Sequence, residues 1–245
     1  MDSTLLLAMV VVAVSGLIFG MTGFGFALVS VPPLLLLYEP GTIVALTFAI
    51  SLATSWLVVA SGWRELERRL VLALMPGALA GMVLGARILD IVDPAIVKIV
   101  AGAIVAAYSL VLLAGAQPSG GRSPWVVSIA GFASGALATS TGLSGPPIVM
   151  LFSARGLTRD AFRSTISAYF VLISIAGLPI LVGSGALGRG ELSTAALLTP
   201  AAIAGTLVGN RLVRRLTAER FRKLTLALLL ATGLMGVATA VAALV

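Results

Sequence analysis

The chain has no cysteine and no histidine among its 245 residues, and only 10% of its residues are charged. Without cysteine, neither a disulfide nor a thiolate metal site can form. Without histidine, the commonest catalytic base and metal ligand is missing. The nine acidic residues all lie outside the apolar stretches or at their ends. We therefore expect no catalytic residues, no metal ion and no cofactor, which makes an enzyme a poor interpretation.

Hydrophobic residues make up 59% of the chain, and the mean hydropathy is +1.14. A soluble domain averages about 25% charged residues, so this chain has too few polar side chains to solvate a globular surface. Lipid must be the solvent for most of that surface, and we predict an all-α integral membrane protein. The formal net charge of +7 fits the Lys/Arg-rich cytoplasmic loops of such proteins. We expect membrane lipid as a partner, and no nucleic acid.

Eight stretches of the chain contain almost no charge, and they predict the hydrophobic segments. Roughly 20 apolar residues make one helical crossing, which suits six of the eight stretches. The first and fifth are too long, because 36 and 32 residues would extend about 50 Å as straight helices. Each either crosses once or forms a hairpin of two short helices. The stretches are residues 3–38, 41–63, 70–86, 99–116, 123–154, 164–188, 192–210 and 224–245.

The chain resembles itself at an offset of 124 residues. Residues 72–87 and 196–211 share the pattern Pro-x4-Gly-x3-Gly-x-Arg, with seven identities in sixteen positions and no gap. Gly-x3-Gly spacing lets two helices pack backbone to backbone. Packing alone would not explain why a Pro and an Arg stand at the same positions in both stretches. We predict two homologous four-segment repeats, at residues 1–118 and 119–245.

The two overlong segments also match each other. Residues 16–33 and 131–147 each carry a Gly-x3-Gly, a break rich in glycine, serine and threonine, and a double proline. Such a break at membrane depth is tolerated only where it lines a cavity or is buried in protein. Paired interrupted segments in two halves of a chain indicate a transporter binding site. The alternative is that these glycines only permit close helix crossing. The predicted substrate-binding residues in the breaks are Thr22, Gly23, Gly25, Ser140, Thr141, Gly142, Ser144 and Gly145.

The distribution of Lys and Arg favours an inverted repeat. If the two overlong segments are hairpins and the N-terminus is outside, thirteen basic residues lie inside and three outside. If those segments cross once, the best division is eleven to five. The positive-inside rule prefers the first arrangement. No Lys or Arg precedes Arg64, so a cleaved signal peptide is not expected and residues 4–19 should be a retained span.

Three segments resemble the sulfite exporter TauE/SafE family, also known as the 4-toluene sulfonate uptake permease family. They are GLIFGMTGFGFALVSVPP at 16–33, GFASGALATSTGLSGPP at 131–147, and FRSTISAYFVL, which contains Arg163. The Gly-x-x-Gly-Pro-Pro signature and the Arg-x-Thr or Arg-x-Ser-like start of the next span are typical of the family. The first motif departs from it, because Phe24 and Phe26 flank Gly25 where the family often has a glycine run. The resemblance implies a multi-pass permease of the bacterial inner membrane for sulfite, sulfonates, sulfoacetate or similar anions.

Helix N-termini at the breaks would suit such an anion, because they offer free N–H groups and partial positive charge. Arg163 either contacts the anion or is only a cytoplasmic anchor. No span has Asp, Glu, His or Lys in its middle, so a proton relay is not visible and we favour export of a small anionic substrate. A non-transporting membrane subunit or sensor, a transporter of an unrelated solute, and a homo-oligomer all remain open.

Overall fold

The computed structural model describes residues 3–113 and 123–213, and every regular element in these residues is a helix. This confirms the all-α prediction. The eighth apolar stretch, 224–245, lies outside the described residues. The helices are α1 (Ser3–Thr22), α2 (Phe26–Leu34), α3 (Pro40–Gly62), the short 3₁₀ helix η1 (Trp63–Glu65), α4 (Arg68–Ile91), α5 (Pro94–Leu113), α6 (Pro124–Thr141), α7 (Gly145–Arg155), α8 (Arg159–Gly183) and α9 (Arg189–Leu212).

Five of the described helices are long and apolar enough to cross a membrane: α1, α3 with η1, α4, α8 and α9. Most of them match the predicted stretches closely. Helix α8 differs, since it begins at Arg159 rather than near residue 164 and ends at Gly183. The hydroxyl of Thr158 accepts a hydrogen bond from the backbone N–H of Ala161 and caps the helix, so its charged first turns are helical as well.

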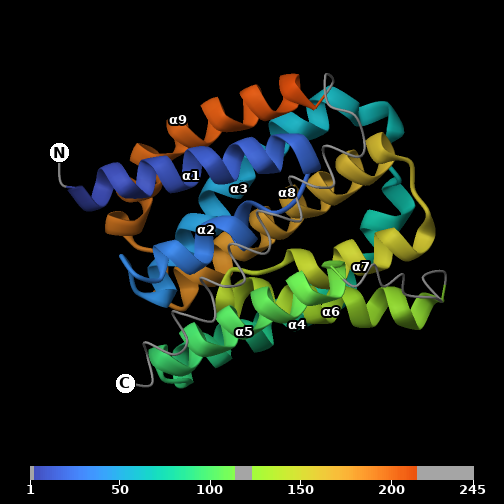
Figure 1. Cartoon of the computed structure of the whole chain (residues 1–245). Coiled ribbons are helices and arrows are strands. Elements are labelled where there is room, and N and C mark those ends of the chain that lie inside the picture. The colour runs from blue at the N-terminus through green and yellow to red at the C-terminus, as the bar shows by residue number, and fades with distance from the viewer. Residues whose placement is uncertain (1–2, 114–122, 214–245) are drawn as a thin grey trace.

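Glycines bring two pairs of helices into backbone contact. A Cβ on Gly81 of α4 would overlap the carbonyl oxygen of Phe132 in α6. In the second pair, a Cβ on Gly205 of α9 would overlap the carbonyl oxygen of Ala13 in α1. Small residues at such crossings are the usual route to tight helix packing in membranes, where lipid is as apolar as the side chains. The Pro-x4-Gly-x3-Gly-x-Arg helices α4 and α9 thus each pack against the first helix of the other half of the chain (Figure 1).

The order of these contacts sets the direction of each helix. Gly16 lies against Ala202 and Gly20 against Thr206, so α1 and α9 are parallel. In the corresponding contacts between α4 and α6, the residue numbers of the two helices also rise together, so these helices are parallel too.

Helices α3 and α8 cross at the centre of the bundle in opposite directions, because Gly62 lies against Ser164 while Gly177 lies against Phe48. A short turn joins α3 to α4 and another joins α8 to α9. It follows that α6 runs opposite to α1, as Figure 1 shows.

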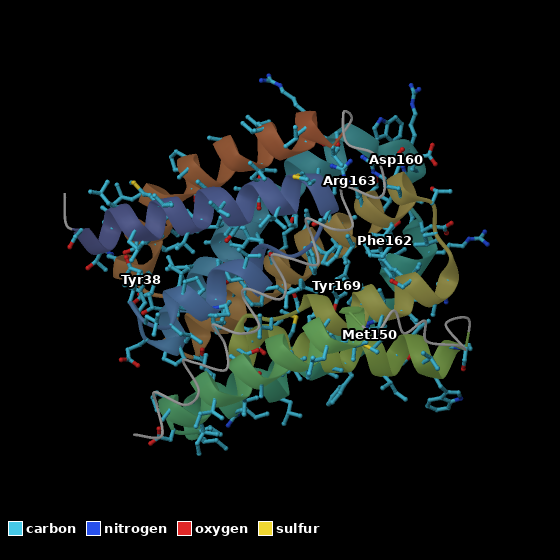
Figure 2. All side chains as sticks on the ribbon, in the orientation of Figure 1. Tyr38, Met150, Asp160, Phe162, Arg163 and Tyr169 are labelled. Carbon is cyan, nitrogen blue, oxygen red and sulfur yellow. The ribbon has the colours of Figure 1, made fainter. Side chains whose placement is uncertain are left out.

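Each overlong segment is divided into two helices, α1 with α2 and α6 with α7. At both breaks a glycine adopts a left-handed conformation, with φ of 79° at Gly23 and at Gly142. Only glycine adopts this conformation without strain. After the first break the chain turns back, because Tyr38 lies at the opposite end of the molecule from Arg163, which contacts the end of α1 (Figure 2).

The double prolines do not occupy equivalent places in the two breaks. Pro146 and Pro147 stand in the first turn of α7, where a proline removes no intrahelical hydrogen bond. Pro32 and Pro33 stand near the end of α2, a helix of nine residues. The Thr-Gly pairs at 22–23 and 141–142 align the breaks instead, at an offset of 119 residues.

One end of the bundle is basic. It gathers the end of α3, the beginning of α4, the end of α7, the beginning of α8 and the end of α9. Glu65, Glu67 and Asp160 also lie at this first end, where the arginines outnumber them. The opposite end carries acidic and basic residues together, including Glu39, Arg87, Asp90 and Arg189. We call the first the basic end; its arginines among the described residues are Arg64, Arg68, Arg69, Arg155, Arg159, Arg163 and Arg211.

Candidate functional site

The two breaks meet at a common cavity between the central helices α3 and α8. We call it the break cavity. Both breaks, the first turn of α2 and the middle portions of α3 and α8 contribute to its wall. Its lining residues are Gly25, Phe26, Ala27, Leu28, Thr47, Phe48, Ser51, Gly142, Ser144, Gly145, Phe170, Ile173 and Ser174.

The break cavity is narrow in this conformation. The volume open to the centre of a water molecule is about 30 Å³. Roughly 10–15 Å³ of such volume is enough for one water, so the cavity has room for one or two waters. A tetrahedral or pyramidal oxyanion is larger than that. The breaks and the side chains between them must therefore separate slightly for such a ligand to bind.

The beginning of α2 brings backbone donors to the cavity. The first N–H groups of an α-helix have no acceptor within the helix. In α2 these belong to Phe26, Ala27 and Leu28, all of which line the cavity, and the first backbone bond is Val29 N–H to Gly25 O at 3.0 Å. The partial positive charge of a helix N-terminus adds to the attraction for an anion.

The beginning of α7 faces the same cavity but offers fewer donors. Gly145 lines the cavity, and the next two residues, Pro146 and Pro147, have no N–H. The N-cap residue Ser144 also lines the wall. The positive ends of two half-helices therefore converge on one space, with the denser set of N–H groups on the α2 side.

The hydroxyl of Thr47 is a second, independent sign of a ligand site. Thr47 is 6% exposed, and its Oγ1 has no hydrogen-bond partner among the described residues. A Cβ on Gly142 would lie 3.4 Å from this oxygen, so the hydroxyl faces the second break across the cavity. An unsatisfied buried hydroxyl costs about 1–3 kcal/mol, and most such groups in native proteins bind water or a ligand. The Thr47 hydroxyl can therefore donate a hydrogen bond to a ligand that enters the cavity.

Four of the nine substrate-binding residues predicted from the sequence line the break cavity: Gly25, Gly142, Ser144 and Gly145. Thr22 and Thr141 shape the breaks instead. Their hydroxyls donate to the carbonyl oxygens of Ile18 and Leu137, both at 2.9 Å, one helical turn back. Each also accepts the backbone N–H two residues ahead, at 3.1 Å for Thr22 and 3.4 Å for Thr141. These bonds fold the chain at the break.

The remaining three lie away from the cavity lining. The hydroxyl of Ser140 donates to the carbonyl oxygen of Ala136 at 2.7 Å, within α6. Gly23 packs against the backbone of Arg163, so a side chain there would collide with α8. Arg163 is 8% exposed and donates from Nη2 to the carbonyl oxygen of Gly20 at 2.6 Å. It thereby caps the C-terminal end of α1, where a cation is favoured.

Helix α8 fastens both breaks. The hydroxyl of Ser167 donates to the carbonyl oxygen of Gly23 at 3.3 Å, at the first break. For the second break, the fully buried Tyr169 donates to Ser134 Oγ at 2.9 Å, and Ser134 donates to the carbonyl oxygen of Ser144 at 2.6 Å. This chain turns the Ser144 carbonyl toward α6. A movement of α8 would be transmitted to both breaks.

The sequence did not single out the side chains that α3 and α8 add to the cavity: Thr47, Ser51 and Ser174, with the apolar Phe48, Phe170 and Ile173. A signal for two of them was present. Thr47 and Ser51 are four residues apart, so they share one face of an otherwise apolar helix. A polar stripe of this kind in a span points to a partner other than lipid.

A comparison with protein families decides the class of the molecule. The model of the sulfite exporter TauE/SafE family matches residues 7–236. The chain belongs to the sulfite exporter TauE/SafE family. No curated protein and no solved structure matches the chain. Together with the five long apolar helices, membership makes this a multi-pass membrane protein of a family of sulfur-anion permeases and exporters.

Proposed function

We propose that the chain is a permease for small sulfur-containing oxyanions such as sulfite, sulfonates or sulfoacetate, and that the anion binds in the break cavity. The observation that carries the proposal is the meeting of two half-helix N-termini with the unpartnered hydroxyl of Thr47. An oxyanion at membrane depth needs donors without a large uncompensated charge. Backbone N–H groups and a hydroxyl supply them.

We propose further that the two halves, residues 1–118 and 119–245, are inverted repeats, each with one broken first segment. Three observations support this. Helix α6 runs opposite to α1, α4 packs on α6 as α9 packs on α1, and both breaks turn at a glycine of the same conformation. In transporters with inverted repeats, the substrate site lies near the bilayer midplane, at discontinuous helices.

The basic end of the bundle faces the cytoplasm of a bacterial inner membrane in this proposal, because inside loops of membrane proteins are rich in Lys and Arg. Export is the favoured direction. An anion leaving an inside-negative cell gains about 2.3 kcal/mol per charge for each 100 mV. The described spans place no carboxylate at the break cavity that could couple uptake to protons.

The test measures binding of the anion first and its transport second. Purified protein in lipid nanodiscs would be melted with sulfite, sulfoacetate, taurine or sulfate. A ligand at 100 times its Kd should raise the free energy of unfolding by about 2.7 kcal/mol. The protecting anion would then be loaded into proteoliposomes, and its efflux followed under an imposed potential. Efflux that equals that of empty liposomes, with no protection by any anion, would instead favour a non-transporting subunit or sensor.

A further inference from the structure

A second cavity opens at the basic end, between the end of α1, the α7 helix and the first turns of α8. Its volume is about 400 Å³, within the range of roughly 300–1,000 Å³ that small-molecule sites occupy. We call it the vestibule. It shares no lining residue with the break cavity. Its wall includes two hydroxyl side chains, Thr22 and Ser153, and two arginines, Arg159 and Arg163.

The charge on the vestibule wall is positive. Among the described residues that line it, Arg159 and Arg163 are charged and no carboxylate is present. The acidic Glu65 and Asp160 line a separate cavity that also touches these two arginines, together with Asn210. The polar side chains that an anion would meet on the vestibule side of the pair are therefore the two arginines and the two hydroxyls, on a wall that is otherwise apolar.

Oxygen atoms hold both guanidinium groups in place. These atoms belong to α1, to α9 and to the residue that follows α9. Arg163 donates from Nη2 to the Gly20 carbonyl and, at 2.8 Å, to Asn210 Oδ1. Arg159 donates from Nη2 to the carbonyl oxygen of Val213 at 2.6 Å. These hydrogen bonds fix the position of each guanidinium, and a fixed fork of N–H groups suits an oxyanion.

Three phenylalanines line the deep wall of the vestibule. The ring of Phe162 makes edge contacts with those of Phe24 and Phe152, with 5.8 Å between centroids in each pair. Phe24 belongs to the first break and precedes Gly25, which lines the break cavity. Phe152 belongs to α7, about two turns beyond the second break, and Phe162 belongs to α8, so the cluster joins the first break to both of these helices. Figure 2 shows Phe162 beside Arg163, on the side of α7.

We infer that the vestibule is a second oxyanion site, in which Arg159 and Arg163 collect the anion at the basic end before it reaches the break cavity. The Phe24–Phe152–Phe162 cluster separates the two sites, since an apolar constriction excludes a hydrated anion until it opens. The role in permeation rests on the proposed function. Binding at the vestibule does not, because it depends on the arginines alone.

The absence of cysteine makes the test direct, because one introduced thiol is the only one in the chain. Ser153→Cys places it in the exposed part of the vestibule. Its rate of modification would be measured with a sulfonate-bearing and a trimethylammonium-bearing methanethiosulfonate. We expect the ratio of the anionic to the cationic rate to be higher at this thiol than at a control thiol outside the vestibule, and sulfate to slow the anionic reagent. Arg159→Gln should lower the anionic rate about two- to tenfold, as expected for one charge removed roughly 10 Å away in a wet site.

Ser123→Cys is the matched control, since it is another serine at the basic end that lines neither cavity. Its rate should not respond to Arg159→Gln. The same ratio of anionic to cationic rates in the Ser153→Cys and Ser123→Cys variants, with no slowing by sulfate, would overturn the vestibule site, even if Arg159→Gln misfolds, because both measurements use the native arginines.

The barrier is tested with Ser174→Cys in the break cavity, in vesicles with the basic end facing the reagent. Because the break cavity is itself narrow, slow modification of this thiol does not by itself test the barrier. Phe162→Ala should accelerate its modification if the cluster is the barrier, and an unchanged rate would overturn the barrier. If vestibule labelling behaves as expected while no sulfur anion is transported, the proposed function fails and the vestibule site stands.

Discussion

Replacement of Thr47 by valine removes the hydroxyl that faces the break cavity and leaves the shape of the side chain almost unchanged. The hydroxyl has no partner in the part of the chain that the structure describes, so its loss should not destabilise the ligand-free protein. Removal of an unsatisfied buried group can instead stabilise by up to about 1–3 kcal/mol, less where a water already satisfies it. The bound state should respond in the opposite direction. A hydrogen bond to a charged group contributes about 1.5–3 kcal/mol, and each 1.4 kcal/mol is a tenfold change in affinity.

The expected result is therefore a protein that melts at the same or a higher temperature without ligand but binds its anion roughly ten- to a hundredfold more weakly. Thermal melting across a ligand titration measures both quantities in one experiment, and efflux from proteoliposomes measures the consequence. Ser55→Ala is the matched control. The Ser55 hydroxyl on the same helix is also buried and without a partner, but it does not line the break cavity.

If Thr47→Val and Ser55→Ala both leave anion affinity and efflux at the level of the unaltered chain, the break cavity is not where the anion binds. If both variants reduce efflux to the same extent, the loss reflects the packing of α3 and not a contact with the ligand. Only a loss specific to Thr47 agrees with the proposed site.

Three further experiments test the packing that holds the breaks. Gly81→Ala should lower the unfolding free energy by about 1–3 kcal/mol, because its Cβ meets the backbone of α6, whereas Gly183→Ala in open space should be neutral or stabilising; thermal unfolding in detergent distinguishes them. Tyr169→Phe and Ser134→Ala should be non-additive, with a coupling of about 0.5–2 kcal/mol in a double-mutant cycle, and additivity would refute their shared bond. Arg163→Lys should destabilise the protein despite its retained charge, since lysine lacks the planar fork that joins Gly20 and Asn210; an unchanged melting temperature would contradict that role.

The sequence predicted the parts of this fold that depend on composition and on single residues. Glycines that must turn left-handed, such as Gly142, mark the breaks, and a chain with so little charge has to dissolve in lipid. The partners of each helix could not be predicted. A Gly-x3-Gly pattern shows that α4 packs closely on some helix, but only the three-dimensional arrangement selects α6. Thr47 was not predicted for the same reason. Its role depends on the second break, which it faces across the cavity and which is far from it in the sequence.

Arg163 illustrates a different limit. The sequence allowed either an anion ligand or a cytoplasmic anchor, and the structure gives it contacts with the end of α1 and with α9. It lines the vestibule and not the break cavity. A long side chain reaches several neighbours, so its sequence position alone fixes neither its depth nor its partners.

The two breaks differ in the donors that they can offer, and this difference predicts on which side of the cavity the anion binds. At an offset of 119 residues, Ala27 of α2 is the position in the first break that is equivalent to Pro146 of α7 in the second. Ala27→Pro would therefore copy into the first break a residue that the second break already accommodates. It removes one N–H from the first turn of α2, where no intrahelical bond depends on it.

If the anion binds on the α2 side, this variant should fold but bind the anion roughly ten- to a hundredfold more weakly, as for any lost charge-assisted hydrogen bond. The reverse exchange, Pro146→Ala, adds a donor to α7 and should not weaken binding. Melting without ligand controls for the fold of both variants. An Ala27→Pro protein that melts normally and binds with full affinity would mean that the N-terminus of α2 does not contact the anion, and that the convergence of the two half-helices serves packing rather than binding.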